Sequence, residues 1–327
     1  MARVVAGFAA SHSPMVAARA EDWVSGAFGP RDRARALVGL DGAPCRYDDA
    51  LARAPADAMD RIAPDRLAAR HAQVQAALAR LRADVAAAAL DALIIVGDDQ
   101  EEVFEPGSQP AIGIYYGPTI RNAQAAAPRD PVDAARQRFQ EPDGDAEYPC
   151  HAPLARYLLE TLTASGFDPA AIGSLPAGRT EGHAYSFAHK FCMSSAPVPL
   201  VPLFLNAYYP PNQPTPARCY ALGEAIAEAV AAFPGDARVG IMASGGLSHF
   251  LVDEALDRAV LDALARKDAD ALRGLPLAKL QSGSSEIRNW ICLGGAVAHL
   301  DLDWAEYVPG YRTPALTGTG LGFARFA

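Results

Sequence analysis

The sequence predicts an α/β fold in which helices flank a central mixed sheet within a single domain. Short apolar runs, typical of buried strands, alternate along the chain with longer amphipathic or alanine-rich runs, typical of helices. Polar or glycine-rich turns follow several of the apolar runs, as they do at the carboxyl ends of strands in open α/β sheets. No internal repeat or strong boundary divides the 327 residues, so we assign them to one domain with a long N-terminal insertion.

The first half of the chain combines three expected strands with an insertion and a long helix. The strand over residues 4–8 is apolar and ends at the polar segment SHSP. Residues 21–64 are rich in Arg, Asp, Gly and Pro and have no sustained period, which indicates an insertion with short helices. Asp65 is a favourable N-cap for an alanine-rich helix over residues 66–90. Two further apolar strands are expected at residues 93–96 and 111–115.

The second half continues the alternation of helices and strands. Residues 119–147 are polar and contain several prolines, so we expect them at the surface. The later elements are, in order, a helix at 151–165, a strand at 201–205, a helix at 218–233, a strand at 239–243, and helices at 253–271 and 286–299. The pair Pro234-Gly235 ends the third of these elements.

Composition and charge exclude several classes of function. The net charge of −9 and the isoelectric point of about 5.3 argue against nucleic-acid binding, because phosphate contacts need clustered Lys and Arg. No apolar run approaches the roughly 20 residues of a membrane helix. The five cysteines are scattered and form no CxxC pair, which favours a reducing compartment over a disulfide scaffold. We therefore expect a cytoplasmic protein that binds neither nucleic acid nor membranes.

Polar residues at the ends of elements are the candidate functional residues. His12 follows the first strand, His183 lies in EGHAYSFAHKF, His249 ends the turn GGLSH, and Glu286 begins the helical segment SSEIRNW. Each also has a structural explanation, since an acidic residue in a first helical turn is favoured by the helix dipole. Together they form the inventory of a mononuclear metal site with an acid/base histidine, because two His and one carboxylate can hold Fe(II) and leave coordination positions open.

An ordered set of motifs spans nearly the whole chain. It comprises SHSP around His12, the strand and acidic turn at Gly97–Phe104, the His183 segment, the segment VPLFLNAYYPPNQPTPARCYALGEAI from Val201, ASGGLSH at Ala243–His249 and SSEIRNW at Ser284–Trp290. In this order the motifs resemble the class III extradiol ring-cleavage dioxygenases, those similar to the catalytic β subunit of protocatechuate 4,5-dioxygenase. Single-chain members that act on gallate or 3-O-methylgallate are the most similar in general appearance.

The resemblance implies Fe(II) as cofactor, with O₂ and a catechol-type aromatic small molecule as substrates. It implies extradiol (meta) cleavage, in which the ring opens beside the two hydroxyl groups. His12 and Glu286 would be metal ligands, His249 would be the catalytic acid/base that deprotonates a catechol hydroxyl, and His183 would be a second catalytic histidine near the bound substrate and oxygen. The family also makes a homodimer the expected assembly.

The third metal ligand of the family is a histidine in the turn after the second strand. Alignment on Phe104 puts Gln100 at that place, so Gln100 is the predicted third ligand of this chain. Glu101 and Asp99 are alternative ligands in the same turn. Two-subunit members of the family cover the site with a small helical partner, and we hypothesise that residues 21–64 supply that cover here.

The departure at Gln100 leaves two other functions open. A histidine-rich zinc site formed by His12, His183 and His249 would suit hydrolytic or other Lewis-acid chemistry. A non-catalytic binding or regulatory subunit would have lost a metal ligand. The joint presence of the three histidines and Glu286 counts against such degeneration.

Overall fold

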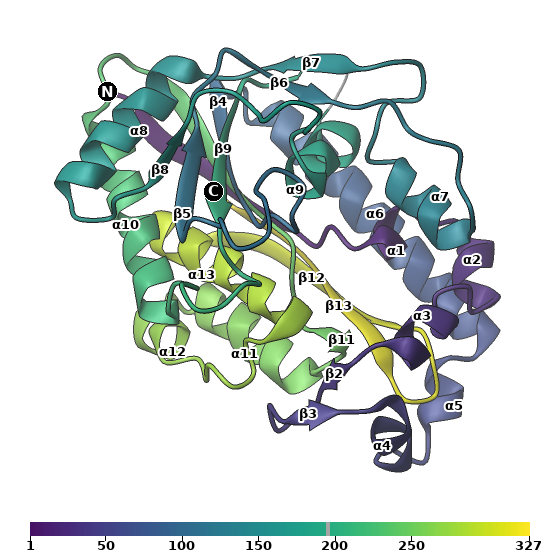
Figure 1. Cartoon of the computed structure of the whole chain (residues 1–327). Coiled ribbons are helices and arrows are strands. Elements are labelled where there is room, and N and C mark those ends of the chain that lie inside the picture. Colours follow the sequence, from purple (N-terminus) through teal and green to yellow (C-terminus); the bar gives the residue numbers. More distant parts are fainter. Residues whose placement is uncertain (194–196) are drawn as a thin grey trace.

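The computed structural model of the chain describes residues 1–193 and 197–327, and its centre is a mixed sheet of nine strands (Figure 1). The four central strands run parallel and are β1 (Arg3–Ala10), β10 (Arg238–Ser244), β4 (Ala92–Gly97) and β9 (Leu200–Leu205). Beyond β9 lie β5 (Ile112–Tyr115), antiparallel to it, and β8 (Ala170–Ile172). Beyond β1 lies the antiparallel β13 (Thr317–Phe326), which also pairs with β11 (His249–Leu251) and β12 (Leu302–Tyr311). The predicted α/β fold with a central mixed sheet is thus confirmed.

The apolar run of β4 shows why such segments become central strands. Successive side chains of a strand point to opposite faces of the sheet. Ile94 and Val96 belong to one hydrophobic core, whereas Leu93 and Ile95 belong to another. All four side chains are fully buried, so both faces of the sheet need a cover of helices.

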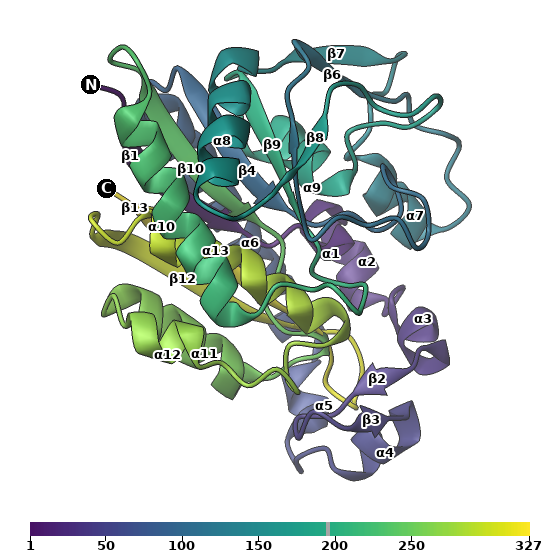
Figure 2. The ribbon, with the colours of Figure 1, turned by 60° about the vertical axis from the view of Figure 1, so that its left-hand side comes forward.

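Two layers of helices provide this cover (Figures 1 and 2). One core is closed by α8 (Ala152–Ala164), α10 (Pro216–Ala232), α11 (Glu254–Ala265), α12 (Ala269–Arg273) and α13 (Ile287–Ala296). The other is closed by α1 (Pro14–Ala17), α2 (Ala20–Val24), α6 (Pro64–Ala87), α7 (Pro131–Gln137) and α9 (His183–Phe187), which continues into a π-helical turn at Ala188–Cys192. In the part of the chain that the structure describes, no helix combines the length and apolarity needed to cross a bilayer.

Residues 21–64 contain only short elements. After α2 these are α3 (Gly29–Ala34), β2 (Leu37–Val38), β3 (Pro44–Cys45), α4 (Tyr47–Ala52) and α5 (Ala58–Arg61). Leu37, Cys45 and Tyr47 form a small hydrophobic core of their own, and Phe250 and Leu251 pack against it. The insertion therefore packs against β11, the strand that begins at His249.

Several expected boundaries were wrong, and each error has a local cause. The helix expected at 253–271 is two helices, α11 and α12, because the chain turns at Lys267 with a φ of +55°. The long helix begins at Pro64, so Asp65 lies in its first turn and Ala63 is the N-cap. The C-terminal hairpin of β12 and β13 was not predicted, since the glycine-rich run of β13 has low strand propensity.

The polar segment 119–147 also carries more structure than expected. It contains β6 (Thr119–Asn122), α7 and the start of β7 (Ala146–Pro149), and the two strands form a separate small sheet. Buried side chains such as Ile120, Val132 and Ala135 belong to the hydrophobic core that α6, α7 and α9 close, so they hold this segment against the domain.

Close packing of α10 on α13 generates a first prediction. A Cβ atom at Gly223 would lie 1.9 Å from the carbonyl oxygen of Cys292, so Gly223→Ala forces the two helices apart. We expect the free energy of unfolding to fall by at least about 1–3 kcal/mol, measured by denaturant titration. Glu228→Ala, at an exposed position of α10, is the control and should change it by less than about 0.5 kcal/mol. Equal losses in the two variants would contradict the packing argument.

A buried carboxyl group behind the turn at His249 generates a second prediction. Asp257 of α11 accepts hydrogen bonds from the amide and the hydroxyl of Ser248 at 2.8 and 2.7 Å, and from the Tyr307 hydroxyl at 2.7 Å. Burial raises the pKa of Asp257 to about 7, although these donors oppose the shift. Since the folded-state pKa lies above the ordinary value of 3.8, the protonated form stabilises the fold. This contribution is complete below the ordinary pKa and is lost as the pH rises through about 7.

The non-titrating variant Asp257→Asn isolates this contribution. We expect the unfolding free energy of the native chain, minus that of the variant, to decrease by about 2–3 kcal/mol between pH 5 and pH 8. Denaturant titrations at several pH values measure the difference. A difference that stays constant over this range would show that Asp257 is ionised throughout.

Candidate active site

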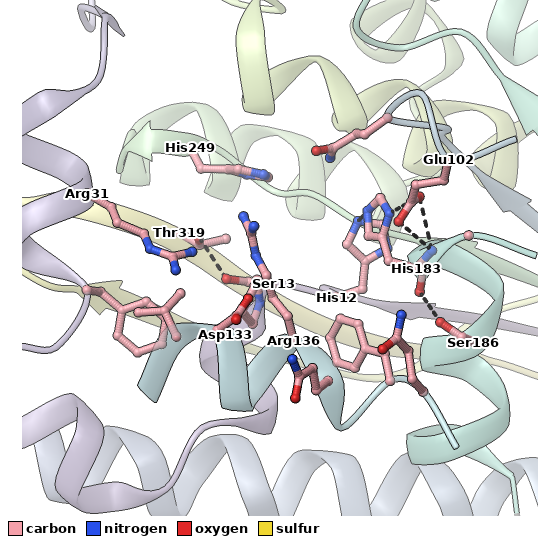
Figure 3. A pocket seen from close by; sticks show the side chains of 18 of the residues that line it. His12, Ser13, Arg31, Glu102, Asp133, Arg136, His183, Ser186, His249 and Thr319 are labelled. Carbon is pink, nitrogen blue, oxygen red and sulfur yellow. Dashed lines mark hydrogen bonds and ion pairs between the residues drawn. The ribbon is translucent and has the colours of Figure 1, made fainter. Parts of the chain in front are cut away.

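Three parallel neighbouring strands bring the candidate residues to one edge of the sheet. β1 leads to His12, β4 leads to Asp98, and β10 leads to the turn Gly245–His249. The carboxyl ends of parallel strands meet at the same edge, so residues distant in sequence converge there. Figure 3 shows His12, His183 and Glu102 together, with His249 across the pocket from them.

The hydrogen bonds of His12 fix which of its ring nitrogens carries a proton. Its Nδ1 lies 3.0 Å from the Ser244 hydroxyl, which donates its own hydrogen to the Ala184 carbonyl at 2.7 Å. Ser244 must therefore accept from the Nδ1–H of His12. In the neutral ring this leaves a lone pair on Nε2, which points into the site.

His183 is oriented in a similar way by a carboxylate. Its Nδ1 lies 2.5 Å from Glu102 Oε2, and its backbone amide donates to the same carboxylate at 3.1 Å. The neutral ring therefore also carries its lone pair on Nε2, which lies 3.1 Å from Nε2 of His12. Two lone pairs at this distance repel each other unless a proton or a metal cation lies between them. A carboxylate behind a histidine is the usual arrangement around metal-binding histidines.

Two buried carboxylates complete the cluster. Glu286 Oε2 lies 3.3 Å from His12 Nε2, and Asp98 Oδ1 lies 3.7 Å from the same nitrogen. Asp98 Oδ2 lies 3.9 Å from His183 Nε2. Ligand atoms of His12, Asp98 and His183 all fall within 4.8 Å of one another, and Asp98 Oδ1 is buried with no hydrogen-bond partner among the described residues. A buried group of acceptors with fewer donors than acceptor atoms suits a cation.

The protonation of the cluster is consistent with this arrangement. Burial, followed by the charge of Glu286, raises the pKa of Asp98 to about 6. Burial opposes the charged form of His183, but Glu102 and Asp98 outweigh it and raise its pKa to about 10. Burial likewise opposes ionisation of Glu286, whereas His249 and His12 hold its pKa well below the ordinary value. Without a metal, the cluster retains protons that a bound cation would displace.

The turn after β4 places its polar residues in different positions. Gln100 lines the pocket, and its amide donates to Asp98 Oδ2 at 3.4 Å. The Asp99 carboxylate accepts from the Val103 amide and the Gln109 side chain, both at 2.8 Å. Glu101 is exposed. Sequence reasoning missed Asp98, the carboxylate that faces the histidines. The sequence feature that could have indicated Asp98 is its position as the first polar residue after a central strand.

His249 lies at the other side of Glu286. Its Nδ1 lies 3.0 Å from the Leu247 carbonyl and donates to it, which leaves Nε2 free to accept or release a proton. Nε2 lies 3.2 Å from Glu286 Oε1, which also accepts from the Tyr208 hydroxyl at 2.5 Å. The backbone amide of His249 donates to the Ser284 hydroxyl. Tyr208 is a further site residue that sequence reasoning missed.

The glycines of the GGLSH motif allow this close approach. Gly245 has a φ of +115°, and a Cβ there would lie 2.7 Å from Glu286 Oε2 and 3.0 Å from the His12 ring. Gly246 donates its amide to Glu286 Oε2 at 2.6 Å. A larger residue at Gly245 would therefore displace the two groups that the turn brings together.

A pocket of about 660 Å³ opens beside the cluster. All five residues predicted for the site line it: His12, Gln100, His183, His249 and Glu286. Phe28 and Arg35 of the insertion and Arg136 of α7 also contribute to its wall. Three other histidines, His71, His151 and His299, each contact backbone atoms elsewhere, as a structural role predicts.

Comparisons with known proteins show the family of the chain. Residues 70–319 match the family described as the catalytic LigB subunit of aromatic ring-opening dioxygenase. A gallate dioxygenase of Pseudomonas putida (strain KT2440) is 30% identical over 179 residues, which are 51% of this chain and 51% of that protein. The chain thus spans about half the length of this curated relative. Because the family match covers well over half of the sequence, the chain belongs to the LigB family of aromatic ring-opening dioxygenase catalytic subunits.

Proposed function

We propose that the protein is an extradiol dioxygenase that opens a catechol-type aromatic ring with Fe(II) and O₂. The observation that carries the proposal is the buried cluster around His12, where four side chains present acceptor atoms to one another beside a pocket. Family membership supports ring opening, and the relative named gallate dioxygenase supports a hydroxylated aromatic acid as substrate.

His12, Asp98 and His183 would hold the metal, with Glu286 as a fourth donor beside His12. Imidazole and carboxylate ligands together suit the Fe(II) of non-haem oxygenases. When bound, the metal would acidify a chelated diol and offer open positions for O₂, and the electrons that reduce O₂ would come from the ring of the diol. In this assignment Asp98 takes the place predicted for Gln100, and His183 is a ligand, whereas the sequence predicted a catalytic role for it.

The remaining residues act on protons and orientation. His249 accepts a proton from the diol at Nε2, because its Nδ1–H is held by the Leu247 carbonyl. Tyr208 donates to Glu286 Oε1 and so fixes the orientation of this carboxylate. Glu102 holds the ring of His183 and its tautomer through Nδ1. The insertion forms one wall of the pocket through Arg35, and we propose that it covers the site against water.

A zinc-dependent Lewis-acid enzyme is the second candidate. Its support is the donor set itself, since Zn²⁺ also binds histidine and carboxylate ligands. Stoichiometric zinc without oxygen uptake on any catechol would favour this function. A protein that binds no metal after anaerobic reconstitution would instead favour a binding subunit.

Metal retention by paired variants tests the ligand set. After anaerobic reconstitution with Fe(II), we expect elemental analysis to find that Asp98→Ala and His12→Ala lose most of the bound iron. Loss of a residue that only hydrogen-bonds a metal ligand weakens metal binding by roughly 10–100-fold, and loss of a ligand itself should weaken it at least as much. Gln100→Ala, a change in the same turn, is the matched control and should retain iron. The opposite result, with iron lost from Gln100→Ala and kept by Asp98→Ala, would restore Gln100 as the ligand.

Oxygen uptake tests the reaction and the role of His249. The native protein with Fe(II) should consume oxygen with at least one member of a catechol panel and form a ring-opened product that absorbs light. His249→Ala should keep its iron but turn over about 10²–10⁴-fold more slowly, as loss of a general acid/base predicts. Unchanged turnover in His249→Ala would remove this residue from the mechanism. No uptake with any catechol would refute the dioxygenase.

A further inference from the structure

The pocket has a second half that is rich in arginine. The arginines in its wall are Arg31, Arg35, Arg129, Arg136 and Arg312, and the acidic residues among them are Asp32 and Asp133. The chain as a whole carries a net charge of −9, so this local excess of positive charge runs against its general composition. A concave basic surface concentrates anions.

Three of these arginines are neutralised by aspartates. Arg31 forms an ion pair with Asp130 at 2.7 Å. The other two are Arg129 with Asp133 at 3.0 Å and Arg312 with Asp32 at 3.1 Å. The guanidinium groups of Arg35 and Arg136 have neither an ion pair nor a hydrogen bond among the residues that the structure describes. Two positive charges in the pocket wall therefore remain available to a ligand.

The two free arginines come from different elements that close the pocket. Arg35 follows α3 in the insertion, and its guanidinium lies 3.3 Å from the ring centre of Phe250, the residue after His249. Arg136 belongs to α7 and lies between Arg31 and the pair His12–His183 in the view of Figure 3. The geometry thus puts positive charge beside the candidate active site and outside its cluster of acceptors.

The electrostatics of the pair favour an anion. Burial lowers the pKa of Arg35, and the charges of Arg312 and Arg136 lower it further, against the effect of Asp32. Partial desolvation at the pocket wall and the neighbouring Arg31 lower the pKa of Arg136, although its side chain is exposed. An anion between them would relieve this repulsion, and a planar guanidinium matches a carboxylate with two parallel hydrogen bonds. Asp32 and Asp133 in the same wall favour a singly charged carboxylate over a phosphate.

The volume of the pocket bears on where that carboxylate is carried. A cavity of roughly 150 Å³ accommodates benzene, whereas this pocket has about 660 Å³. A single ring with small substituents would leave most of it filled with water. Pockets of several hundred Å³ are typical of larger ligands.

We infer that Arg35 and Arg136 bind the carboxylate of an aromatic diol whose acidic group is carried on an extension beyond the ring that is opened. This inference rests on the proposed function for the position of the diol. It makes the insertion and α7 the determinants of substrate choice, while the ends of β1 and β4 hold the reacting ring. Arg35 lies outside the residues 70–319 that match the family, so it is a feature that the matched region does not supply.

Binding of matched acids and esters tests the inference. The probes are 3-(3,4-dihydroxyphenyl)propanoate and its methyl ester, titrated into the Fe(II)-loaded protein by calorimetry without oxygen. We expect the acid to bind about tenfold or more tightly than the ester, because charge-assisted hydrogen bonds contribute this much. Arg35→Gln and Arg136→Gln should each reduce the acid-to-ester ratio by about fivefold or more. Arg31→Gln, in the same wall but paired with Asp130, is the control and should leave the ratio within about twofold.

Several outcomes would overturn the inference. They are a ratio near one in the native protein, a ratio that neither Arg35→Gln nor Arg136→Gln changes, an equal loss in Arg31→Gln, and no binding of either probe. The ring-attached acid 3,4-dihydroxybenzoate should bind more weakly than the extended acid and respond less to both substitutions. An equal response would place the carboxylate beside the ring and refute the extension.

The same titrations separate this inference from the proposed function. After the binding measurement, admission of oxygen shows whether the bound diol is consumed. Preserved acid-to-ester discrimination without oxygen uptake on this diol or on any member of the catechol panel would contradict the dioxygenase and leave the arginine pair in place. Oxygen uptake with an unchanged acid-to-ester ratio in both arginine variants would support the dioxygenase and contradict the role of the arginine pair.

Discussion

The candidate site depends on a shortage of hydrogen-bond donors around His12. Its Nδ1–H is committed to Ser244, and the Nδ1–H of His183 is committed to Glu102, so the two Nε2 atoms meet at 3.1 Å with only carboxylate oxygens nearby. Such a group is stable when buried only if it shares a cation, whether protons or a metal. The glycine turn at Gly245 and the hydrogen bond from Tyr208 to Glu286 support this group, since the turn lets Glu286 approach His12 and the hydrogen bond fixes the orientation of its carboxylate.

One short turn carries the carboxylates of Asp98, Asp99 and Glu102, and each has a different role. Asp99 is occupied by the Val103 amide and so shapes the turn itself, whereas Asp98 is buried and faces the histidines. Glu102 reaches across to His183 and fixes its ring. The close contact of Gly182 with Glu102, where an added Cβ would lie 3.0 Å from Oε2, keeps that reach possible. The acidic residues of this segment therefore have separate roles, which the composition of the segment alone does not reveal.

Sequence patterns predicted the sheet, most helices and the convergence of His12, His249 and Glu286, because buried strands leave a strong apolar signal and their ends meet at one edge. The hairpin of β12 and β13 was missed because its glycines weaken the strand signal. Alignment indicated Gln100, but the direction in which each side chain leaves the turn depends on the backbone, which a sequence does not fix. The structure puts Asp98 against the histidines and Gln100 against Asp98.

The arginines were beyond prediction for a different reason. Arg35 lies in a segment without periodicity, and contacts distant in sequence bring it to the pocket: the small core of Leu37 and Tyr47 against Phe250, and the ion pair of Asp32 with Arg312. Segments of this kind are held by their contacts with the domain, so they can change without disturbing the sheet. The strand ends and the insertion therefore stand under different constraints. The cluster at β1 and β4 must keep its acceptors within a few ångströms of one another, whereas the wall opposite needs only the right charge and space. On this physical ground, related chains that share the cluster should differ most in the insertion and in α7, where the wall that faces the substrate is built.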